Sequence, residues 1–251
     1  MLTRRIIPCL DVNNGRVVKG IRFAGLRDMG DPAALAAEYA SQGADEIVIL
    51  DISATTSLRA TAADVVARCR AVLSIPLTVG GGVRSIDDAS RLLDRGADRV
   101  CVNSAAVARP PLVTELADRY GTQCVVVAAD TRRSSAFCWT ILTRSGQLDT
   151  GLDAVSWARE AAALGAGEML LTSWDRDGTR DGYDLDLLRA VCGAVRIPVI
   201  ASGGASTVEH MKEAFDAGAD AVLAASIFHE GDRTVSGIKR ELSGFGVEVR
   251  L

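Results

Sequence analysis

The stretch SIPLTVGGGVRSIDDASRLLDRGADRVCVNSAA, residues 74–106, recurs in outline as RIPVIASGGASTVEHMKEAFDAGADAVLAASIF, residues 196–228. The pattern of each copy predicts an apolar strand, a glycine-rich turn, an amphipathic helix and a second apolar strand. Matching residues are 122 positions apart throughout, as in the pairs Gly43–Gly165, Pro76–Pro198, Gly82–Gly204 and Ser104–Ser226. The repeat therefore indicates parallel strands joined by helices, in two copies within one chain.

The same pattern extends over the whole chain of 251 residues. Eight apolar runs rich in Val, Ile and Leu alternate with helical patterns, at 5–11, 46–51, 75–81, 99–104, 124–130, 168–173, 197–204 and 221–226. Runs without polar alternation are typical of parallel strands covered on both faces. Eight such units predict an α/β protein, a (β/α)8 or TIM barrel built from two duplicated half-barrels, with a single domain over 1–251. A doubly wound open sheet is the alternative.

The composition argues against several classes of protein. The net charge is −4 and no basic stretch stands out, which argues against a nucleic-acid partner. No apolar run approaches the length of a membrane span, and the N-terminal apolar run is too short for a signal peptide, so we expect a cytoplasmic protein with no membrane partner. The six cysteines form no CxxC pair and lie largely in apolar runs, so we expect small buried hydrophobes and no disulfide framework.

The strand ends predict a site. In such barrels chemistry occurs where strands end, and Asp11 and Asp130 end the first and fifth strands. PCLDV at 8–12 aligns with VAADT at 127–131 at an offset of 119, so these two aspartates occupy equivalent positions of the repeat. Glycine-rich loops follow the third and seventh strands, and a serine follows the fourth and eighth, namely Ser104 and Ser226. Glycines let a ligand approach backbone N–H groups, and helix N-termini attract anions. We expect two phosphate cradles for one elongated ligand, with two carboxylates between them.

Simpler explanations exist for each feature. A glycine after a strand is often only a turn, and a strand-end aspartate is often a cap or an ion-pair partner, which holds also for Asp51. The two histidines match no metal-ligand spacing, so we expect no metal site. The long segment after Asp11 is interpreted as a polar lid loop, in which Gly15, Gly20 and Gly25 allow closure and Lys19 contacts the ligand.

Motifs across nearly the whole chain resemble the cyclase subunit of imidazole glycerol phosphate synthase, from histidine biosynthesis. They are RIIPCLDV at 5–12, LRDMGDP at 26–32, GADEIVILD at 43–51, TVGGGVR at 78–84, LTSWDRDGTRDGYD at 171–184, VIASGGA at 199–205 and AVLAASIFH at 221–229. The resemblance implies a lyase without metal or cofactor that uses ammonia and a bisphosphorylated ribulosyl aminoimidazole carboxamide ribotide. The products are imidazole glycerol phosphate and an aminoimidazole carboxamide ribotide.

The resemblance also assigns residues. It implies that Asp130 is the principal acid/base and Asp11 its partner. It places substrate and phosphate binding at Lys19, Asp51, Gly82, Asn103, Ser104, Thr172, Asp177, Gly178, Gly203, Gly204, Ala225 and Ser226.

A partner is implied as well. The resemblance places a glutaminase, a glutamine amidotransferase, at the N-terminal end of the barrel as a heterodimer, with ammonia passing through the barrel. The gate to this channel falls on Arg5, Glu46, Arg99 and Glu168, each at the start of a strand, and Gln123 falls on partner-facing surface. Two positive and two negative charges can neutralise one another, although they can also simply stabilise the base of the barrel.

Some positions depart from the family pattern. Arg99 replaces a lysine, Cys101 a small polar residue and Ser104 a threonine, and Trp174 is bulky for its position. These departures leave open a paralogue acting on a related substrate. Two other hypotheses remain. One is an aldose–ketose isomerase of the same bisphosphate pathway, and the other is a binding subunit that has lost catalysis. The isomerase needs no ammonia route, and intact aspartates argue against the binding subunit.

Overall fold

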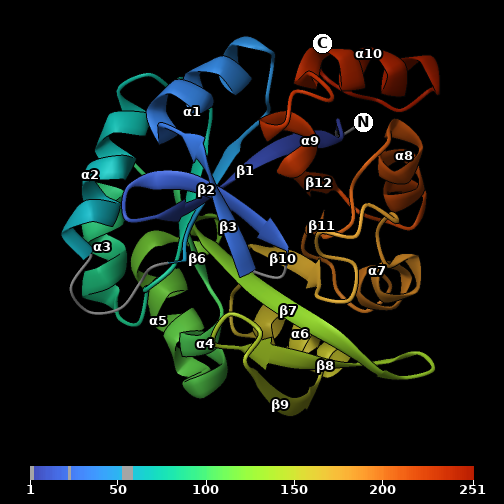
Figure 1. Cartoon of the computed structure of the whole chain (residues 1–251). Helices are drawn as coiled ribbons and strands as arrows, with labels where there is room; N and C mark the ends of the chain where they lie inside the picture. The colour runs from blue at the N-terminus through green and yellow to red at the C-terminus, as the bar shows by residue number, and fades with distance from the viewer. Residues whose placement is uncertain (1–2, 22–23, 53–58) are drawn as a thin grey trace. The chain divides into compact units, whose positions relative to one another are not determined.

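A computed structural model describes residues 3–21, 24–52 and 59–251. Figure 1 labels the helices and strands along the chain. The chain divides into two compact units. Met1–Cys101 and Ala224–Leu251 form the terminal unit, and Val102–Leu223 form the central unit. This division differs from the sequence repeat, because the last helices of the chain belong with the first strands.

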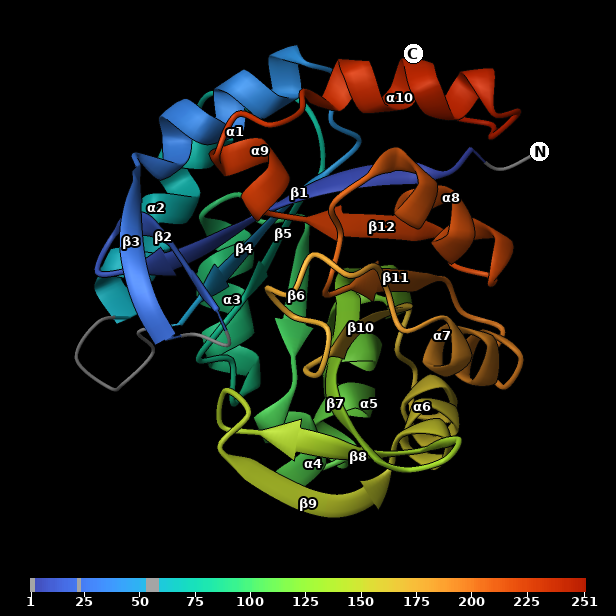
Figure 2. The same ribbon diagram turned by 45° about the vertical axis from the view of Figure 1, so that its right-hand side comes forward.

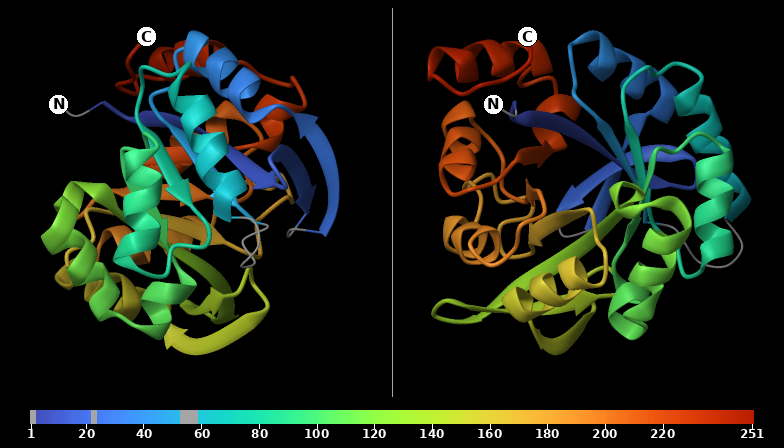
Figure 3. Two further views of the ribbon diagram at one scale, coloured as in Figure 1. Left: turned by 90° about the vertical axis from the view of Figure 1, so that its left-hand side faces the viewer. Right: turned by 180° about the vertical axis from the view of Figure 1, so that it is seen from behind.

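The terminal unit is built on parallel strands that pair in sequence order, β1, β4, β5 and β6. Its strands are β1 (Arg5–Asn13), β2 (Arg16–Ile21), β3 (Ala24–Gly30), β4 (Ile47–Asp51), β5 (Leu77–Gly80) and β6 (Arg99–Val102), whose last residue belongs to the central unit. Its helices are α1 (Pro32–Ser41), α2 (Arg59–Arg70), α3 (Ile86–Asp94), α9 (Ser226–His229) and α10 (Val235–Gly244). Helices α1, α2 and α3 lie side by side (Figure 3).

The central unit repeats this plan with the parallel order β7, β10, β11 and β12. Its strands are β7 (Val125–Ser135), β8 (Cys138–Thr143), β9 (Leu148–Asp153), β10 (Glu168–Ser173), β11 (Val199–Ser202) and β12 (Ala221–Ala224), whose last residue belongs to the terminal unit. Its helices are α4 (Ser104–Ala108), α5 (Pro111–Tyr120), the 3-10 turn η1 (Thr122–Cys124), α6 (Ala154–Ala163), α7 (Leu185–Cys192) and α8 (Val208–Asp216).

Strand order decides the fold class. All eight predicted strands are present, and a helix follows each of them before the next parallel strand or the end of the chain. Within each unit the neighbours follow sequence order, whereas a doubly wound sheet reverses its order at a switch point. The chain therefore has the (β/α)8-barrel fold class that the sequence predicts.

The segment after Asp11 corrects one interpretation. Instead of an irregular loop, β1 continues into the antiparallel strands β2 and β3 (Figure 2). Asn14 and Gly15 have φ of 50° and 78°, as a type I′ hairpin turn requires, so Gly15 is fixed in a tight turn. The central unit carries an equivalent antiparallel extension, in which β8 and β9 follow β7. These two strands were not predicted from the sequence.

Side chains cap several helices, and part of the cysteine set lies in the core. Asp31, Ser85 and Thr207 accept hydrogen bonds from backbone N–H groups in the first turns of α1, α3 and α8. All six cysteines are free thiols, and Cys9, Cys69 and Cys101 are buried. Cys138 is exposed, contrary to expectation, because it starts a strand at a hairpin tip. Among the described residues no helix is long and apolar enough to cross a membrane.

Candidate active site

Asp11 lies near the C-terminal end of β1 and is almost fully buried. The Asn14–Gly15 turn folds β2 back along β1, which brings Lys19 Nζ to 3.7 Å from Asp11 Oδ2. The thiol of Cys9, two residues earlier on the same face of the strand, lies 3.8 Å from Asp11 Oδ1. Asp11 is therefore a buried carboxylate that faces both a cation and a weak sulfur donor.

Asp51 ends the neighbouring strand, β4, where it pairs with Val12. It too is buried, so two carboxylates end adjacent parallel strands at the same edge of the sheet. The Gly80–Gly82 loop follows β5 on the other side of β4. A Cβ on Gly81 would lie 2.2 Å from the Asp51 carbonyl oxygen. Close packing is therefore enough to require a glycine here, whether or not a ligand binds.

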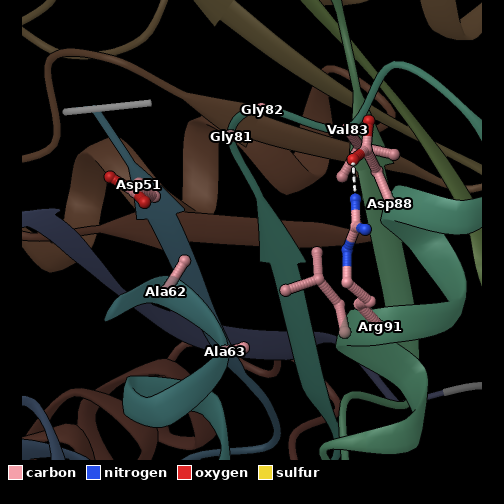
Figure 4. A pocket seen from close by; sticks show the side chains of 9 residues that line it. Asp51, Ala62, Ala63, Gly81, Gly82, Val83, Asp88 and Arg91 are labelled. Atoms are coloured by element: carbon pink, nitrogen blue, oxygen red, sulfur yellow. Dashed lines mark hydrogen bonds and ion pairs between the residues drawn. The ribbon is translucent and has the colours of Figure 1, made fainter. Parts of the chain in front are cut away.

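A pocket opens beside this loop between α2 and α3 (Figure 4). It holds about 390 Å³ including its open mouth, and Asp51, Gly81 and Gly82 form one side of it. On α3, the Arg91 guanidinium reaches the Asp88 carboxylate, and Asp88 also accepts a hydrogen bond from the Arg84 amide. The predicted Gly82 cradle thus borders a pocket that is also lined by the paired side chains of Asp88 and Arg91.

In the central unit, Asp130 lies near the end of the parallel pairing of β7 with β10, opposite Thr172. The side-chain amide of Asn103 donates a hydrogen bond of 2.9 Å to Asp130 Oδ2. Asn103 Oδ1 is buried and has no hydrogen-bond partner among the described residues, so it remains available as an acceptor. Asn103 thus orients Asp130 in the central unit, and Lys19 faces Asp11 in the terminal unit.

Ser104 follows Asn103 and begins α4. Its Oγ accepts a hydrogen bond of 2.9 Å from the backbone N–H of Arg144, in the turn between β8 and β9. The hydroxyl proton of Ser104 can still be donated to a ligand.

The second glycine-rich loop is explained by packing within the central unit. A Cβ on Gly203 would lie 2.7 Å from the Ser173 carbonyl oxygen, and one on Gly204 only 2.2 Å from that of Gly182. Asp177 and Gly178 lie in the turn after β10, where Asp177 N donates to Ser173 O. These glycines permit close backbone approach, which is compatible with a phosphate cradle but does not require one.

Ala225 and Ser226 follow β12 and belong to the terminal unit, where Ser226 begins α9. The last residue of that helix, His229, was not predicted as part of the site. Its Nδ1 lies 2.6 Å from Tyr39 Oη, and its Nε2 lies 3.0 Å from the Cys9 carbonyl oxygen. Because the strand carries Cys9 two residues before Asp11, this histidine ties α9 to the strand that bears the carboxylate.

Burial governs the titration of this network. Burial lowers the pKa of His229 to about 4, although the hydrogen bond to Cys9 opposes the shift. Burial and the nearby Asp11 charge raise the pKa of the Cys9 thiol well above its usual value. The neutral imidazole then donates from Nε2 and accepts from the Tyr39 hydroxyl.

The predicted gate residues of the terminal unit do come together. Arg5 and Arg99 place Nη1 atoms 3.1 and 3.0 Å from Glu46 Oε2. Thr78, which was not predicted, donates a hydrogen bond of 2.5 Å to the other carboxylate oxygen. Only 1% of the Glu46 side chain is exposed, so this is a buried ion-pair cluster at the N-terminal ends of the strands.

The remaining partner-related residues lie in the central unit. Glu168 begins β10 and is buried, and it takes part in further polar interactions. Gln123 is exposed in η1, where its side-chain amide donates to the Tyr120 carbonyl.

Taken with the fold class, carboxylates, amides and hydroxyls at the C-terminal ends of parallel strands define an enzyme of the (β/α)8-barrel class. Comparison with known families narrows this class. A family model described as histidine biosynthesis protein matches residues 5–234. The chain belongs to this family, whose members are histidine biosynthesis enzymes of the isomerase and cyclase types.

Proposed function

We propose that the chain is the cyclase subunit of imidazole glycerol phosphate synthase. In the proposed reaction, ammonia adds to the ketone of the ribulosyl group of the bisphosphorylated ribotide, and water leaves to form an imine. The new nitrogen then attacks the neighbouring formamidine carbon, and the bond from this carbon to the aminoimidazole nitrogen breaks. Ring closure yields imidazole glycerol phosphate and releases the aminoimidazole carboxamide ribotide.

The two aspartates move the protons in this scheme. Asp130, oriented by Asn103, acts as the principal acid/base, because addition and elimination each require proton transfer at the reacting nitrogen. Asp11 acts as its partner, and Lys19 stabilises the carboxylate charge at 3.7 Å. Asn103 Oδ1 offers a further acceptor for a substrate hydroxyl or amine.

The ligand has a phosphate at each end, and the proposal assigns one phosphate to each cradle. Gly82, Asn103 and Ser104 bind the first phosphate. Gly203, Gly204, Ala225 and Ser226 bind the second, while Asp51, Thr172, Asp177 and Gly178 bind the body of the ligand.

One observation favours a cyclase over an isomerase. Arg5 and Asp11 are six residues apart on β1, so they lie on the same face of the strand, about 20 Å from each other. The Glu46 cluster at one end and the catalytic carboxylate at the other therefore share one face of the strands. An isomerase has no use for a buried charge cluster at that end, whereas a cyclase requires an entry for ammonia there.

The proposal includes a partner. A glutaminase would bind at the N-terminal strand ends as a heterodimer and deliver ammonia past Arg5, Glu46, Arg99 and Glu168, with Gln123 on the docking surface. In water near neutral pH, ammonia is mostly protonated to ammonium, which is not a nucleophile. Delivery inside the protein keeps the ammonia unprotonated until it reaches the substrate. A cytoplasmic location belongs to the same proposal.

Two parallel assays test this function. Purified protein is given the ketose bisphosphate ribotide with an ammonium salt at about pH 8.5, where more ammonia is unprotonated, and separately its aldose isomer without ammonia. We expect ammonia-dependent turnover of the ketose alone. Isomerisation of the aldose without ammonia would instead support the isomerase, and turnover of neither compound would favour a paralogue with a related substrate.

A further inference from the structure

Trp174 packs directly on a glycine in the turn that joins β8 to β9. A Cβ added to Gly146 would lie 2.2 Å from the Trp174 ring, so the indole covers the backbone of this residue. The Trp174 backbone N–H also donates a hydrogen bond of 2.8 Å to Thr131 O, next to Asp130. The indole therefore connects the end of β10 to the tip of the β8–β9 hairpin.

The turn beneath Trp174 has an unusual backbone. Arg144 and Ser145 have φ of 54° and 53°, and Gly146 has 79°. Two successive residues other than glycine in the left-handed region are uncommon, and such conformations persist where surrounding contacts hold them. The Gln147 N–H closes the turn on the Arg144 carbonyl at 3.2 Å, and the Trp174 ring covers it.

This turn sets the hydroxyl of Ser104. The Arg144 N–H donates to Ser104 Oγ at 2.9 Å, which occupies an acceptor site and leaves the hydroxyl proton for a ligand. The Arg144 side chain is exposed, so its guanidinium is accessible to a ligand. Guanidinium groups bind phosphate through paired hydrogen bonds.

We propose that Trp174 and the Arg144–Gln147 turn form one positioning device for a ligand phosphate. Trp174 holds the turn, the Arg144 amide orients the Ser104 hydroxyl, and the Arg144 guanidinium binds the phosphate that this hydroxyl receives. The inference rests on the proposed function, because it specifies how the Ser104 end of the bisphosphate ligand is recognised. Trp174 is a positioning residue, and Arg144 is a specificity residue for the phosphate.

The chain carries its own reporter for this device. Trp139 and Trp157 are fully buried, whereas Trp174 is partly exposed, so ligand binding at the turn changes chiefly the Trp174 fluorescence. Titration with inorganic phosphate should give a saturable fluorescence change in the wild type that is lost in Trp174→Phe. Arg144→Gln and Ser104→Ala should each weaken phosphate binding by about 10-fold, the range for loss of a charge-assisted hydrogen bond.

Two glycines give a matched pair for the turn itself. Gly146 and Gly151 have φ of 79° and 72°, but a Cβ on Gly151 would meet nothing within 4 Å. Gly146→Ala should raise the KM for the bisphosphate substrate about 10-fold with little change in kcat, because it disturbs recognition of a phosphate remote from the reacting atoms. Gly151→Ala should leave both constants unchanged.

The outcomes separate this inference from the function on which it rests. If Ser104→Ala weakens phosphate binding while Arg144→Gln and Gly146→Ala bind like the wild type, the device is refuted and the cradle stands. If Ser104→Ala binds phosphate normally, the proposed cradle fails together with the device. Arg144→Gln tests the device even if Gly146→Ala does not fold, because the exposed Arg144 side chain can be replaced without disturbing the core.

Discussion

Lys19 Nζ lies 3.7 Å from Asp11 Oδ2, whereas the repeat-related Asp130 accepts its hydrogen bond from the neutral amide of Asn103. Duplication thus placed two carboxylates at equivalent strand ends and gave them different partners. The nearby cation stabilises the charged form of Asp11, and the Asn103 amide orients Asp130. In the proposed reaction, these two contacts hold the two aspartates in place for proton transfer.

Replacing either aspartate should abolish most of the chemistry without loss of the fold. Asp11→Asn and Asp130→Asn should each lower ammonia-dependent turnover by at least about 100-fold, the range for loss of a general acid or base. Affinity for the ligand should change far less. Asp64→Asn, an exposed carboxylate on α2, is the control. Near-normal turnover in either active-site variant would show that its aspartate has another role.

The buried cluster predicts a change in the source of nitrogen. Arg99→Gln removes one of the two arginines that contact Glu46 but leaves Arg5 and Thr78 in place. Glutamine-dependent activity with a glutaminase should fall by more than ammonium-dependent activity, because only the first uses the entry. Arg159→Gln, an exposed arginine on α6, should leave the ratio of the two activities unchanged. Equal losses in Arg99→Gln would make the cluster structural.

Charge reversal at the same cluster should act on stability. Glu46→Lys would leave three cationic side chains around a site where the carboxylate is 1% exposed. Loss of one partner in a buried ion pair typically costs about 3–5 kcal/mol, so chemical denaturation should show a decrease of that order in the free energy of unfolding. An unchanged denaturation midpoint would mean that the cluster opens to solvent.

Gly204 should matter first for packing. A Cβ there would lie 2.2 Å from the Gly182 carbonyl oxygen, whereas a Cβ on Gly231 would meet nothing within 4 Å. Both residues have positive φ, 95° and 75°, so alanine brings backbone strain to each. Gly204→Ala should therefore lower the melting temperature clearly more than Gly231→Ala. Equal shifts would show that the backbone around Gly182 relaxes and that the glycine is free to serve a ligand alone.

His229 gives a pH dependence with a definite sign. Its pKa is lowered to about 4 in the folded chain, from an ordinary value of 6.5, so below pH 6.5 the unfolded chain takes up a proton that the folded chain does not. The free energy of unfolding should fall as pH decreases from 6.5 to 4, by up to about 3 kcal/mol from this group.

The comparison with His229→Gln isolates that contribution, because carboxylates titrate in both proteins and a glutamine does not titrate. The difference in unfolding free energy between the two proteins should be constant above pH 6.5 and shrink below it. A difference that stays constant down to pH 4.5 would contradict the low pKa of the folded state.

Much of this arrangement could be predicted from periodicity and repetition. The strands ending at Asp11 and Asp130 were predictable because apolar runs and helix caps are local signals. The hairpins β2–β3 and β8–β9 were missed because β3 and β9 are rich in polar residues and glycine, and because β2 and β8 are short segments that no helix separates from their neighbours. Asn14–Gly15 is nevertheless a typical hairpin turn.

The site was less predictable wherever it depends on side-chain contacts between distant segments. Cys9 and His229 lie 220 residues apart in sequence, and no local pattern pairs them. Likewise, the sequence marks Trp174 as unusually bulky but does not show that its ring lies on Gly146. Glycines also misled in part, since Gly81, Gly203 and Gly204 are required by neighbouring backbone whether or not a phosphate binds.

The central claim is that this chain builds an imidazole ring from ammonia. The most direct measurement supplies the ketose bisphosphate ribotide with ¹⁵N-ammonium and follows the products by ¹⁵N-detected NMR and mass spectrometry. The account predicts one ¹⁵N atom in the ring of imidazole glycerol phosphate, none in the released carboxamide ribotide, and no labelled product with Asp130→Asn. Unlabelled products, or conversion of the substrate to an isomer of the same mass, would contradict it.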